Sequence, residues 1–381
     1  MIKSYKYRVY PNKAQQEMFA KTFGCVRYVY NYALSLKKEA YEKDKTNISV
    51  YDISHKIVQL KSTLEWLKEP SHNSLCNSLK HLDKAYNNFF RNKKGFPKFK
   101  SKSNNQSFTI QQCIKLDWDK SKLSIVKIKD IKIKLCRRFE GKIKNVTISK
   151  TPTHKYFASI LVDDGIEIPE KPKIITKSVG IDVGIKTLAV LSNGQEIENP
   201  KWLKSKLKRL KFLQRRASRK KKGSNNRKKA NFRVAKLHEK ITNSRKDYLH
   251  KATTKIIREN QAVYVEDLRI KNMQKNHCLA QAISDASWGE FTRQLEYKSI
   301  WYGVHFAKVN PRNTSKMCAR CGFINKELTL RDRIWTCPQC KTVLSRDGNA
   351  SENIKNIGQE MSESMPVESI ALASSEKQEI L

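Results

Sequence analysis

The chain of 381 residues has few acidic residues and no long apolar run. No stretch approaches the roughly 18–20 consecutive apolar residues that a membrane-spanning helix needs. Residues 1–6 (MIKSYK) also lack the apolar core of a signal peptide. We therefore expect a cytoplasmic protein with no membrane partner.

A cysteine pattern typical of disulfide-bonded proteins is also missing. Four of the nine cysteines form two C-x2-C pairs, and the other five stand singly. The single cysteines are Cys25, Cys76, Cys113, Cys136 and Cys278. Scattered cysteines of this kind predict reduced thiols rather than a disulfide framework, in agreement with a cytoplasmic protein.

Basic residues are abundant: 77 Lys and Arg stand against 36 Asp and Glu, a formal net charge of +41. A compact chain with so much charge of one sign repels itself unless a polyanion screens it. A membrane surface or an acidic protein could supply that screening. Nucleic acid is the favoured partner, because neutralising its phosphates releases counterions and drives binding.

The first part of the chain alternates between predicted strands and helices. Residues 2–10 alternate in polarity up to Pro11 and predict a strand. A capping box at Asn12 and Gln15 then predicts a helix, which we expect Gly24 to interrupt. Further helices are expected at about 50–67 and 74–91, and strands at 107–110, 123–128, 131–135, 143–149 and 156–162. This order predicts a β-barrel that carries a helical insertion at about 12–105.

Composition places the domain boundaries. The segment 166–177 contains two prolines and is typical of a linker, so we assign residues 1–168 to a first domain and 169–357 to a second. Residues 358–381 hold five glutamates, one lysine and no periodicity, which predicts a disordered tail.

Two features of the first domain suit nucleic acid. The polar face of the predicted helix 74–91, with Ser74, Asn77 and Lys80, is a candidate reader of duplex DNA. The loop at 92–103 interleaves lysines, among them Lys98, with aromatic residues. Bases stack on aromatic rings while phosphates pair with lysines. A solvated loop with its aromatic side chains turned inward is the alternative.

Two apolar strands of the second domain each contain an acid. Asp182 lies in the segment 179–185 (VGIDVGI), and Glu266 ends the segment 262–266 (AVYVE). A buried carboxylate is costly unless it is paired or bound to a metal. In an RNase H-type sheet these two strands lie side by side, so both acids would converge at one edge. Asp267 beside Glu266 remains an alternative, because strand alternation alone does not decide between them.

Asp347 opens the last predicted helix and is the candidate third ligand. Three carboxylates around two Mg²⁺ ions about 3.5–4 Å apart would activate water and stabilise the leaving oxygen of a phosphodiester. Asp347 as a simple helix N-cap is the alternative interpretation.

The four paired cysteines have the spacing of a zinc ribbon. Cys318, Cys321, Cys337 and Cys340 form a C-x2-C-x15-C-x2-C pattern, which brings four thiolates onto one tetrahedral Zn²⁺. A redox C-x2-C motif is the alternative, but neither pair follows a βαβ strand. Four thiolates close the coordination sphere, so we expect a structural ion.

A strongly basic helix precedes the second acid. Residues 201–233 hold 16 Lys and Arg and no acid, while leucines at helical spacing keep an apolar stripe. We expect a helical hairpin whose tip lies near 219–223 and whose cationic face meets phosphates. The candidate contacts are Lys208, Arg209, Arg215 and Arg216. A merely solvated charged face is the alternative.

Together these segments resemble the TnpB family of transposon-encoded RNA-guided DNA endonucleases, which is related to type V CRISPR effectors. The resemblance extends from residue 5 to about 357. It is carried by 5–11 (YKYRVYP), 22–27 (TFGCVR), 95–100 (GFPKFK), 180–184 (GIDVG), 265–268 (VEDL), 301–303 (WYG), 311–315 (PRNTS), 346–350 (RDGNA) and the four paired cysteines.

The resemblance implies an α+β multidomain fold: a WED-type β-barrel with a helical recognition insertion, then an RNase H-like (RuvC) nuclease domain with a zinc ribbon at about 312–344. It implies that Asp182, Glu266 and Asp347 are the catalytic acids and hold two Mg²⁺ ions. It also implies one protein bound to one guide RNA from the transposon end, acting in the prokaryotic cytoplasm on nucleoid DNA. One departure is Ser345, where the family usually has an acid.

The predicted activity is cleavage of double-stranded DNA beside a short target-adjacent motif. A nuclease-inactive RNA-guided DNA-binding repressor is the first alternative, although such a protein needs no acidic triad. A non-catalytic zinc-ribbon RNA-binding protein is the second. That alternative leaves the acids on apolar strands unexplained.

Overall fold

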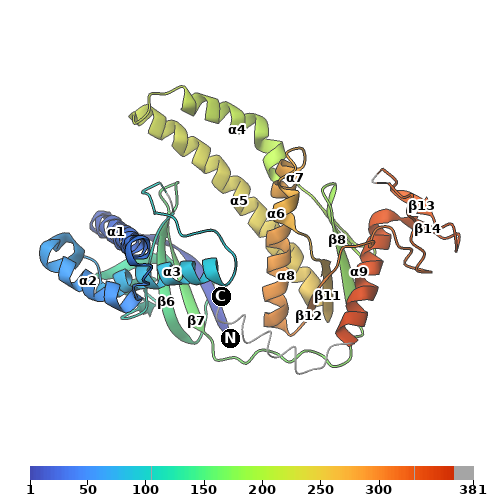
Figure 1. The fold of residues 1–381 in the computed structure, drawn as a ribbon, viewed down its shortest axis with the longest axis horizontal. Coiled ribbons are helices and arrows are strands. Elements are labelled where there is room, and N and C mark those ends of the chain that lie inside the picture. Colours follow the sequence, from blue (N-terminus) through green and yellow to red (C-terminus); the bar gives the residue numbers. More distant parts are fainter. Residues whose placement is uncertain (104, 330, 364–381) are drawn as a thin grey trace. The chain divides into compact units, whose positions relative to one another are not determined.

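The computed structural model describes residues 1–103, 105–329 and 331–363, and it divides into two compact units (Figure 1). The first unit is Met1–Ile166, and the second begins at Glu167. No helix in the described part of the chain is long and apolar enough to cross a membrane.

The first unit is a seven-stranded sheet in the order β2-β6-β7-β1-β5-β4-β3, in which every neighbouring pair is antiparallel. Along the described strands, no pairing joins the two edges β2 and β3. The strands are β1 (Ile2–Tyr10), β2 (Gln106–Ile110), β3 (Lys115–Asp117), β4 (Lys122–Ile125), β5 (Ile128–Lys134), β6 (Lys142–Lys150) and β7 (Tyr156–Asp163). Buried and partly exposed side chains alternate along β7, as in a sheet with one face in the core.

Three helices lie between β1 and β2 in the chain: α1 (Lys13–Asp44), α2 (Val50–Thr63) and α3 (His72–Phe90), with the 3-10 turn η1 (Glu65–Lys68) between α2 and α3. The predicted capping box is confirmed, since Gln15 N–H donates to the Asn12 side chain and Asn12 N–H donates back to Gln15. The predicted interruption at Gly24 is wrong. Helix α1 runs through it without a break, because the buried face from Phe19 to Leu34 packs on the core and outweighs the low helix propensity of one glycine.

The second unit is built on a five-stranded sheet in the order β10-β9-β8-β11-β12. Its strands are β8 (Ser178–Val183), β9 (Thr187–Leu191), β10 (Glu196–Glu198), β11 (Ala262–Glu266) and β12 (His305–Val309). Strands β8, β11 and β12 are parallel, and β9 and β10 continue antiparallel. A hairpin turn at residues 193–194 joins β9 to β10, with Gly194 at φ 83°.

Helices cover both faces of this sheet. Alternate residues of β11 face opposite sides: Val263 and Val265 pack with α5 (Asn225–Glu259) and α8 (Trp288–Tyr302), while Tyr264 packs with α9 (Arg346–Glu363). The short helices α6 (Ile270–Met273) and α7 (Ala280–Ala286) lie between β11 and α8 in the chain. Since α9 runs to Glu363, the predicted tail is helical over residues 358–363, and its remainder lies outside the described residues.

Helix α9 lies unusually close to the sheet because two glycines permit it. A Cβ atom at Gly180 of β8 would stand 2.1 Å from the Ser351 carbonyl oxygen, and one at Gly358 would stand 2.2 Å from the Tyr264 ring. Any larger residue at either position would push the helix away. This contact fixes where α9 begins relative to the ends of β8 and β11.

The basic segment forms the expected helical hairpin. Helix α4 (Trp202–Ser218) lies beside α5, and Leu210, Leu237 and Ile241 are buried between them (Figure 1). The tip includes Gly223 at φ 86°, a left-handed conformation that glycine adopts without strain. The buried Asp285 carboxylate accepts the Leu203 and Lys204 N–H groups, which fixes the start of α4.

Candidate active site and zinc ribbon

Two of the predicted acids lie at the ends of neighbouring parallel strands. Strands β8 and β11 pair in the register Ala262↔Ser178 to Val265↔Ile181, so the next residue on each strand is Glu266 and Asp182. This is the side-by-side arrangement that we expected for these two strands.

The two acids also share one face of the sheet. Gly180 and Tyr264 both contact α9, and side chains two residues apart on a strand point to the same face. Asp182 and Glu266 each stand two residues further on, so both lie on the α9 face. Asp267 points away and is exposed, with its N–H donating to the Val309 carbonyl. The geometry therefore favours Glu266 over its neighbour.

Asp347 lies in the first turn of α9, one helical turn before Ser351 at the Gly180 contact. Its carboxylate accepts from Nη1 of Arg333, at 3.4 Å to each oxygen. The helix cap belongs to Ser345, whose hydroxyl accepts the Gly348 N–H at 3.3 Å. Asp347 is thus not the N-cap, and its carboxylate stands on the side of the sheet that carries the other two acids.

The electrostatics of the three acids indicate a site that needs a cation. Burial, reinforced by the negative charges of Glu266 and Asp347, raises the pKa of the Asp182 carboxyl to about 8. Burial also raises the pKa of Glu266, although the hydrogen bond from Thr314 partly opposes this. Neighbouring carboxylates that cannot all ionise alone become stable together when a divalent cation binds.

The donor set fits Mg²⁺, which prefers oxygen ligands and is commonly held by a few carboxylates. The three acids do not, however, form a tight cluster. Among the described residues, only the four paired cysteines bring three or more potential ligand atoms within 4.8 Å of one another. The carboxylates thus form an open group that spans more than one ligand sphere.

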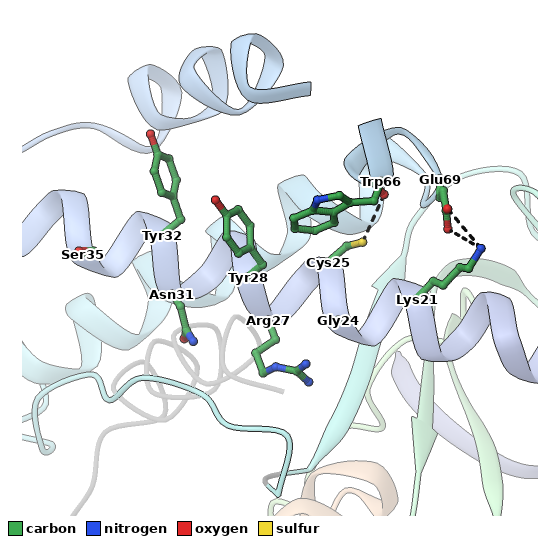
Figure 2. Close-up of a pocket in the computed structure, with 10 residues that line it drawn as sticks. All are labelled: Lys21, Gly24, Cys25, Arg27, Tyr28, Asn31, Tyr32, Ser35, Trp66 and Glu69. Atoms are coloured by element: carbon green, nitrogen blue, oxygen red, sulfur yellow. Dashed lines mark hydrogen bonds and ion pairs between the residues drawn. The ribbon is translucent and has the colours of Figure 1, made fainter. Parts of the chain in front are cut away.

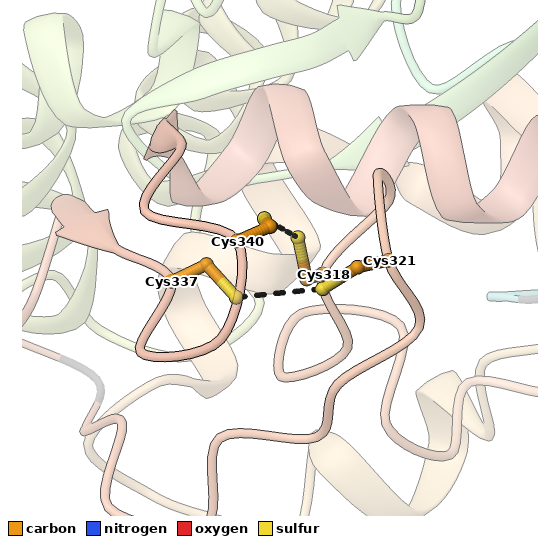
Figure 3. A group of neighbouring side chains, drawn as sticks. All are labelled: Cys318, Cys321, Cys337 and Cys340. Carbon is orange, nitrogen blue, oxygen red and sulfur yellow. Dashed lines mark hydrogen bonds between the residues drawn. The ribbon is translucent and has the colours of Figure 1, made fainter.

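The four cysteines form a compact thiol cluster (Figure 3). The Sγ atoms of Cys318 and Cys340 are 3.7 Å apart, and those of Cys321 and Cys337 are 3.6 Å apart. A tetrahedral ion with Zn–S bonds of about 2.3 Å holds its sulfur atoms about 3.8 Å apart. The cluster fits a structural Zn²⁺, as the spacing of the cysteines predicted.

The two C-x2-C turns are built alike. In the first turn, the Cys318 N–H donates to Phe323 O at 2.8 Å, and the Cys318 carbonyl accepts the Gly322 N–H at 2.9 Å. In the second turn, the Cys337 N–H donates to Thr342 O at 2.9 Å, and the Cys337 carbonyl accepts the Lys341 N–H at 2.9 Å. Gly322 and Lys341 both have a positive φ. The strands β13 (Ile334–Thr336) and β14 (Val343–Ser345) pair around the second turn. Backbone hydrogen bonds therefore hold the thiols in place locally.

Buried polar side chains join the ribbon to the acids. Asn349, next to the third acid, donates to Met317 O at 2.6 Å and accepts the Ala319 N–H at 2.8 Å. Asn353 donates to Thr314 O (2.8 Å) and Met317 O (2.6 Å). The Thr314 hydroxyl in turn donates to Glu266 at 2.6 Å. All three side chains are at most 4% exposed.

Sequence reasoning missed these three linking residues as site residues. Thr314 and Asn349 lie inside the motifs 311–315 and 346–350, but nothing in their residue types indicated a link between acids and ribbon. Asn353 stands on the same face of α9 as Asn349, one turn later, and that spacing was the available signal.

Most of the predicted nucleic-acid contacts are exposed, with two exceptions. The side chains of Lys80, Lys98, Lys208, Arg209, Arg215 and Arg216 are exposed to solvent. Asn77 is only 3% exposed, and its amide donates to Thr109 O at 3.1 Å and to Asn73 at 2.9 Å. Ser74 is buried as well. The expectation of an exposed polar face is wrong for both residues. The Asn77 amide joins α3 to β2, and the Ser74 hydroxyl donates to Ser71 O at the start of α3.

Three family models match the chain: "Helix-turn-helix domain" over residues 1–46, "Probable transposase" over 159–277 and "Cas12f1-like, TNB domain" over 288–354. A Streptomyces pristinaespiralis protein named "Putative RNA-guided DNA endonuclease" is 39% identical over 93% of this chain and 89% of its own length. The chain belongs to the TnpB family. Residues 1–46 of this TnpB protein fold as β1 and one continuous helix, not as two helices with a turn.

An Escherichia coli relative named "Putative RNA-guided DNA endonuclease InsQ" is 33% identical over 94% of this chain and 92% of its own length. Among solved structures, one described as the Cas12f1-sgRNA-target DNA complex aligns with a TM-score of 0.59 at 18% identity. It covers 91% of this chain and 83% of that one. At this identity the likeness concerns the fold alone, a mixed α/β multidomain architecture.

Proposed function

We propose that this TnpB protein is an RNA-guided DNA endonuclease that cuts double-stranded DNA next to a short target-adjacent motif. The observation that carries the proposal is the placement of Asp182 and Glu266 at the ends of adjacent parallel strands, with Asp347 at the start of the helix on the same face. The names of the two relatives described above support an RNA-guided endonuclease activity.

Asp182, Glu266 and Asp347 would hold two Mg²⁺ ions. When bound, these ions supply an activated water and charge stabilisation for the leaving oxygen of the phosphodiester. The chain itself provides rigid placement of the ligands. Two of the acids stand on strands, and Thr314 orients Glu266 by its hydrogen bond. The close contact between Gly180 and α9 sets how near Asp347 lies to the sheet.

In this proposal the second unit is the RuvC nuclease domain with the zinc ribbon, and the first unit is the WED-type domain with α1–α3 as its recognition insertion. A guide RNA from the transposon end would be bound by one protein. Exposed lysines and arginines would contact phosphates, namely Lys80, Lys98, Lys208, Arg209, Arg215 and Arg216. Base pairing with the guide would select the target.

The test uses the protein purified with its bound RNA. That RNA should be one discrete species, and its sequence defines a target to be placed beside randomised flanks in a plasmid library. Cleavage of a subset of flanks, dependent on Mg²⁺ and on the RNA, is the expected result. Cutting that persists after the RNA is removed would contradict guidance.

Variants then test the site. Asp182→Ala should lower cleavage by at least about a thousandfold while guided DNA binding stays close to normal, because the acid holds metal rather than DNA. Glu266→Gln should behave in the same way, and Asp267→Asn is the matched control that should still cut. Loss of cleavage in Asp267→Asn with activity retained in Glu266→Gln would overturn the ligand assignment.

A further inference from the structure

An open pocket of about 650 Å³ lies on α1 in the first unit (Figure 2). The pocket is lined by residues of α1, by one residue of the turn η1 and by the residue directly after that turn. The lining residues are Lys21, Gly24, Cys25, Arg27, Tyr28, Asn31, Tyr32, Ser35, Trp66 and Glu69. None of these residues is used in the proposed chemistry.

Flat aromatic faces dominate the pocket. The rings of Tyr28 and Tyr32, one helical turn apart, lie with their planes within 8° of parallel and their centroids 6.2 Å apart. Trp66 stands edge-on to Tyr28 at 5.0 Å. The Trp66 side chain is 41% exposed, a high value for so large an apolar group in a folded unit. Such faces suit a planar ligand.

Gly24 is an independent sign that something closely approaches this surface. It lies inside a 32-residue helix, where glycine is less stable than alanine. A Cβ atom there would meet nothing within 4 Å, so the packing of this chain does not require glycine. What the missing side chain leaves is open space beside the aromatic rings.

The charged side chains of the pocket fit a ligand with an uncharged ring and a phosphate group beside it. Inside the pocket, Lys21 is paired with Glu69 at 3.1 Å, which cancels both charges. Arg27 is held at the edge by Gln106, its Nη1 donating at 2.9 Å. A guanidinium held in this way offers a positive charge next to an uncharged aromatic slot.

We propose that this pocket binds one unpaired nucleobase of a nucleic-acid strand, stacked on the parallel Tyr28 and Tyr32 rings over Gly24, with Trp66 edge-on beside it and Arg27 at the adjoining phosphate. The inference rests on the nucleic-acid-binding part of the proposed function. Base–aromatic stacking is tolerant of sequence, so the pocket anchors a strand without reading it. The strand is either the RNA that the protein carries or a single-stranded stretch of DNA.

Photocrosslinking of the full-length protein tests the proposal and separates these two sources. The probes are two oligonucleotides of one sequence, an RNA with 5-iodouridine and a DNA with 5-iododeoxyuridine, each placed at every position in turn. Irradiation followed by mass spectrometry should find crosslinks on Tyr28, Tyr32 or Trp66 with one of the probes at one or two positions. Crosslinks confined to other residues with both probes would overturn the proposal.

Pocket-filling variants supply a second readout. Gly24→Leu should occupy the slot, keep the melting temperature at or above wild type, and weaken binding of the crosslinking probe by about 5- to 100-fold, the range for removal of one stacked base. Ala14→Leu, at an exposed position of α1 outside the pocket, is the matched control and should bind normally. Tyr28→Phe should bind normally and Tyr28→Ala weakly. Normal binding by both Gly24→Leu and Tyr28→Ala would overturn the proposal.

The same preparations distinguish this inference from the proposed function. Plasmid cleavage that persists while crosslinks map elsewhere rejects the pocket and leaves the endonuclease intact. Cleavage abolished in Asp182→Ala, with crosslinks retained on the pocket, supports both. Crosslinks on the pocket in a protein that never cuts DNA support the pocket and reject the endonuclease.

Discussion

The two groups of potential metal ligands in the second unit differ in how closely their atoms already match the geometry of a bound ion. The four thiols already stand at the spacing that one tetrahedral ion requires. The three carboxylates share one face of the sheet, yet they do not draw together within one ligand sphere. A closed site suits an ion that stays, and an open one suits ions that meet a substrate.

The difference follows from how each group is held. Each pair of thiols lies on one short turn whose backbone hydrogen bonds fix it locally. The acids come from three segments far apart in the chain, so only the packed sheet and α9 bring them near one another. Burial, reinforced by repulsion from the other two acids, raises the pKa of Asp182. Local geometry therefore builds the thiol cluster, and tertiary packing builds the proposed catalytic site.

Replacing a thiol should have the largest effect on the fold. Zinc binding contributes on the order of 10 kcal/mol in zinc-finger peptides, so Cys337→Ser should lose its zinc and melt the ribbon. Metal analysis and thermal unfolding measure the two effects together. The exposed single cysteine Cys278, changed to Ser, is the matched control. Unchanged melting in a zinc-free Cys337→Ser protein would show that the ribbon folds without metal.

Burial of Asp182, reinforced by repulsion from Glu266 and Asp347, predicts that the stability of the protein depends on pH in buffer without Mg²⁺. The folded-state pKa of Asp182, about 8, is above its ordinary value of 3.8, so the folded protein binds the proton more tightly than the unfolded chain does. Stability from this group should therefore fall as the pH rises from about 4 to about 8. Urea unfolding over that range should show a shallower fall for Asp182→Asn. Equal slopes in the two proteins would contradict the electrostatic argument.

Breaking the link between the two groups should have a moderate effect. Asn353→Ala removes a donor to the Thr314 and Met317 carbonyls. Met317 O keeps the Asn349 amide, so the Thr314 carbonyl is the group that loses its side-chain donor, at a cost of about 1–3 kcal/mol. The variant should keep its zinc, lose stability, and need a higher Mg²⁺ concentration for half-maximal cleavage. Asn356→Ala, on the same helix but partly exposed, is the control. An unchanged Mg²⁺ requirement would show that the ribbon does not position the acids.

The smallest effect is expected on α4, which takes no part in either metal site. Arg215→Ala should weaken nucleic-acid binding only slightly and reduce the slope of the salt dependence by about one unit, because one phosphate is no longer neutralised. Lys43→Ala on the exposed end of α1 is the comparison variant. Identical slopes for wild type and Arg215→Ala would remove this residue from the interface.

Local signals in the sequence predicted most elements well. The capping box at Asn12 and Gln15 and the hairpin tip near Gly223 both appear where expected. Each of these features depends on residues that are neighbours in the chain, so residue type and spacing are enough to predict it. The zinc ribbon is predictable for the same reason, because its ligands come in pairs on single turns.

Features that depend on distant partners were not predictable. Asn77 and Ser74 are typical of a polar surface, but the Asn77 amide is paired with Thr109, whose position only the folded sheet reveals. The choice between Glu266 and Asp267 was open until the contact between Tyr264 and α9 showed which face of β11 carries the site. Propensity likewise misjudged Gly24, because burial along α1 decides that the helix continues.

The close seating of α9 also sets when the protein can first act during its own synthesis. Asp182 and Glu266 leave the ribosome well before α9, whereas a domain generally folds as a unit. A growing chain, or one cut short before α9, would lack Asp347 and the helix that packs against Gly180. Under the proposed chemistry such a fragment is harmless. Arrival of the last helix would therefore be the step that completes the proposed group of three acids.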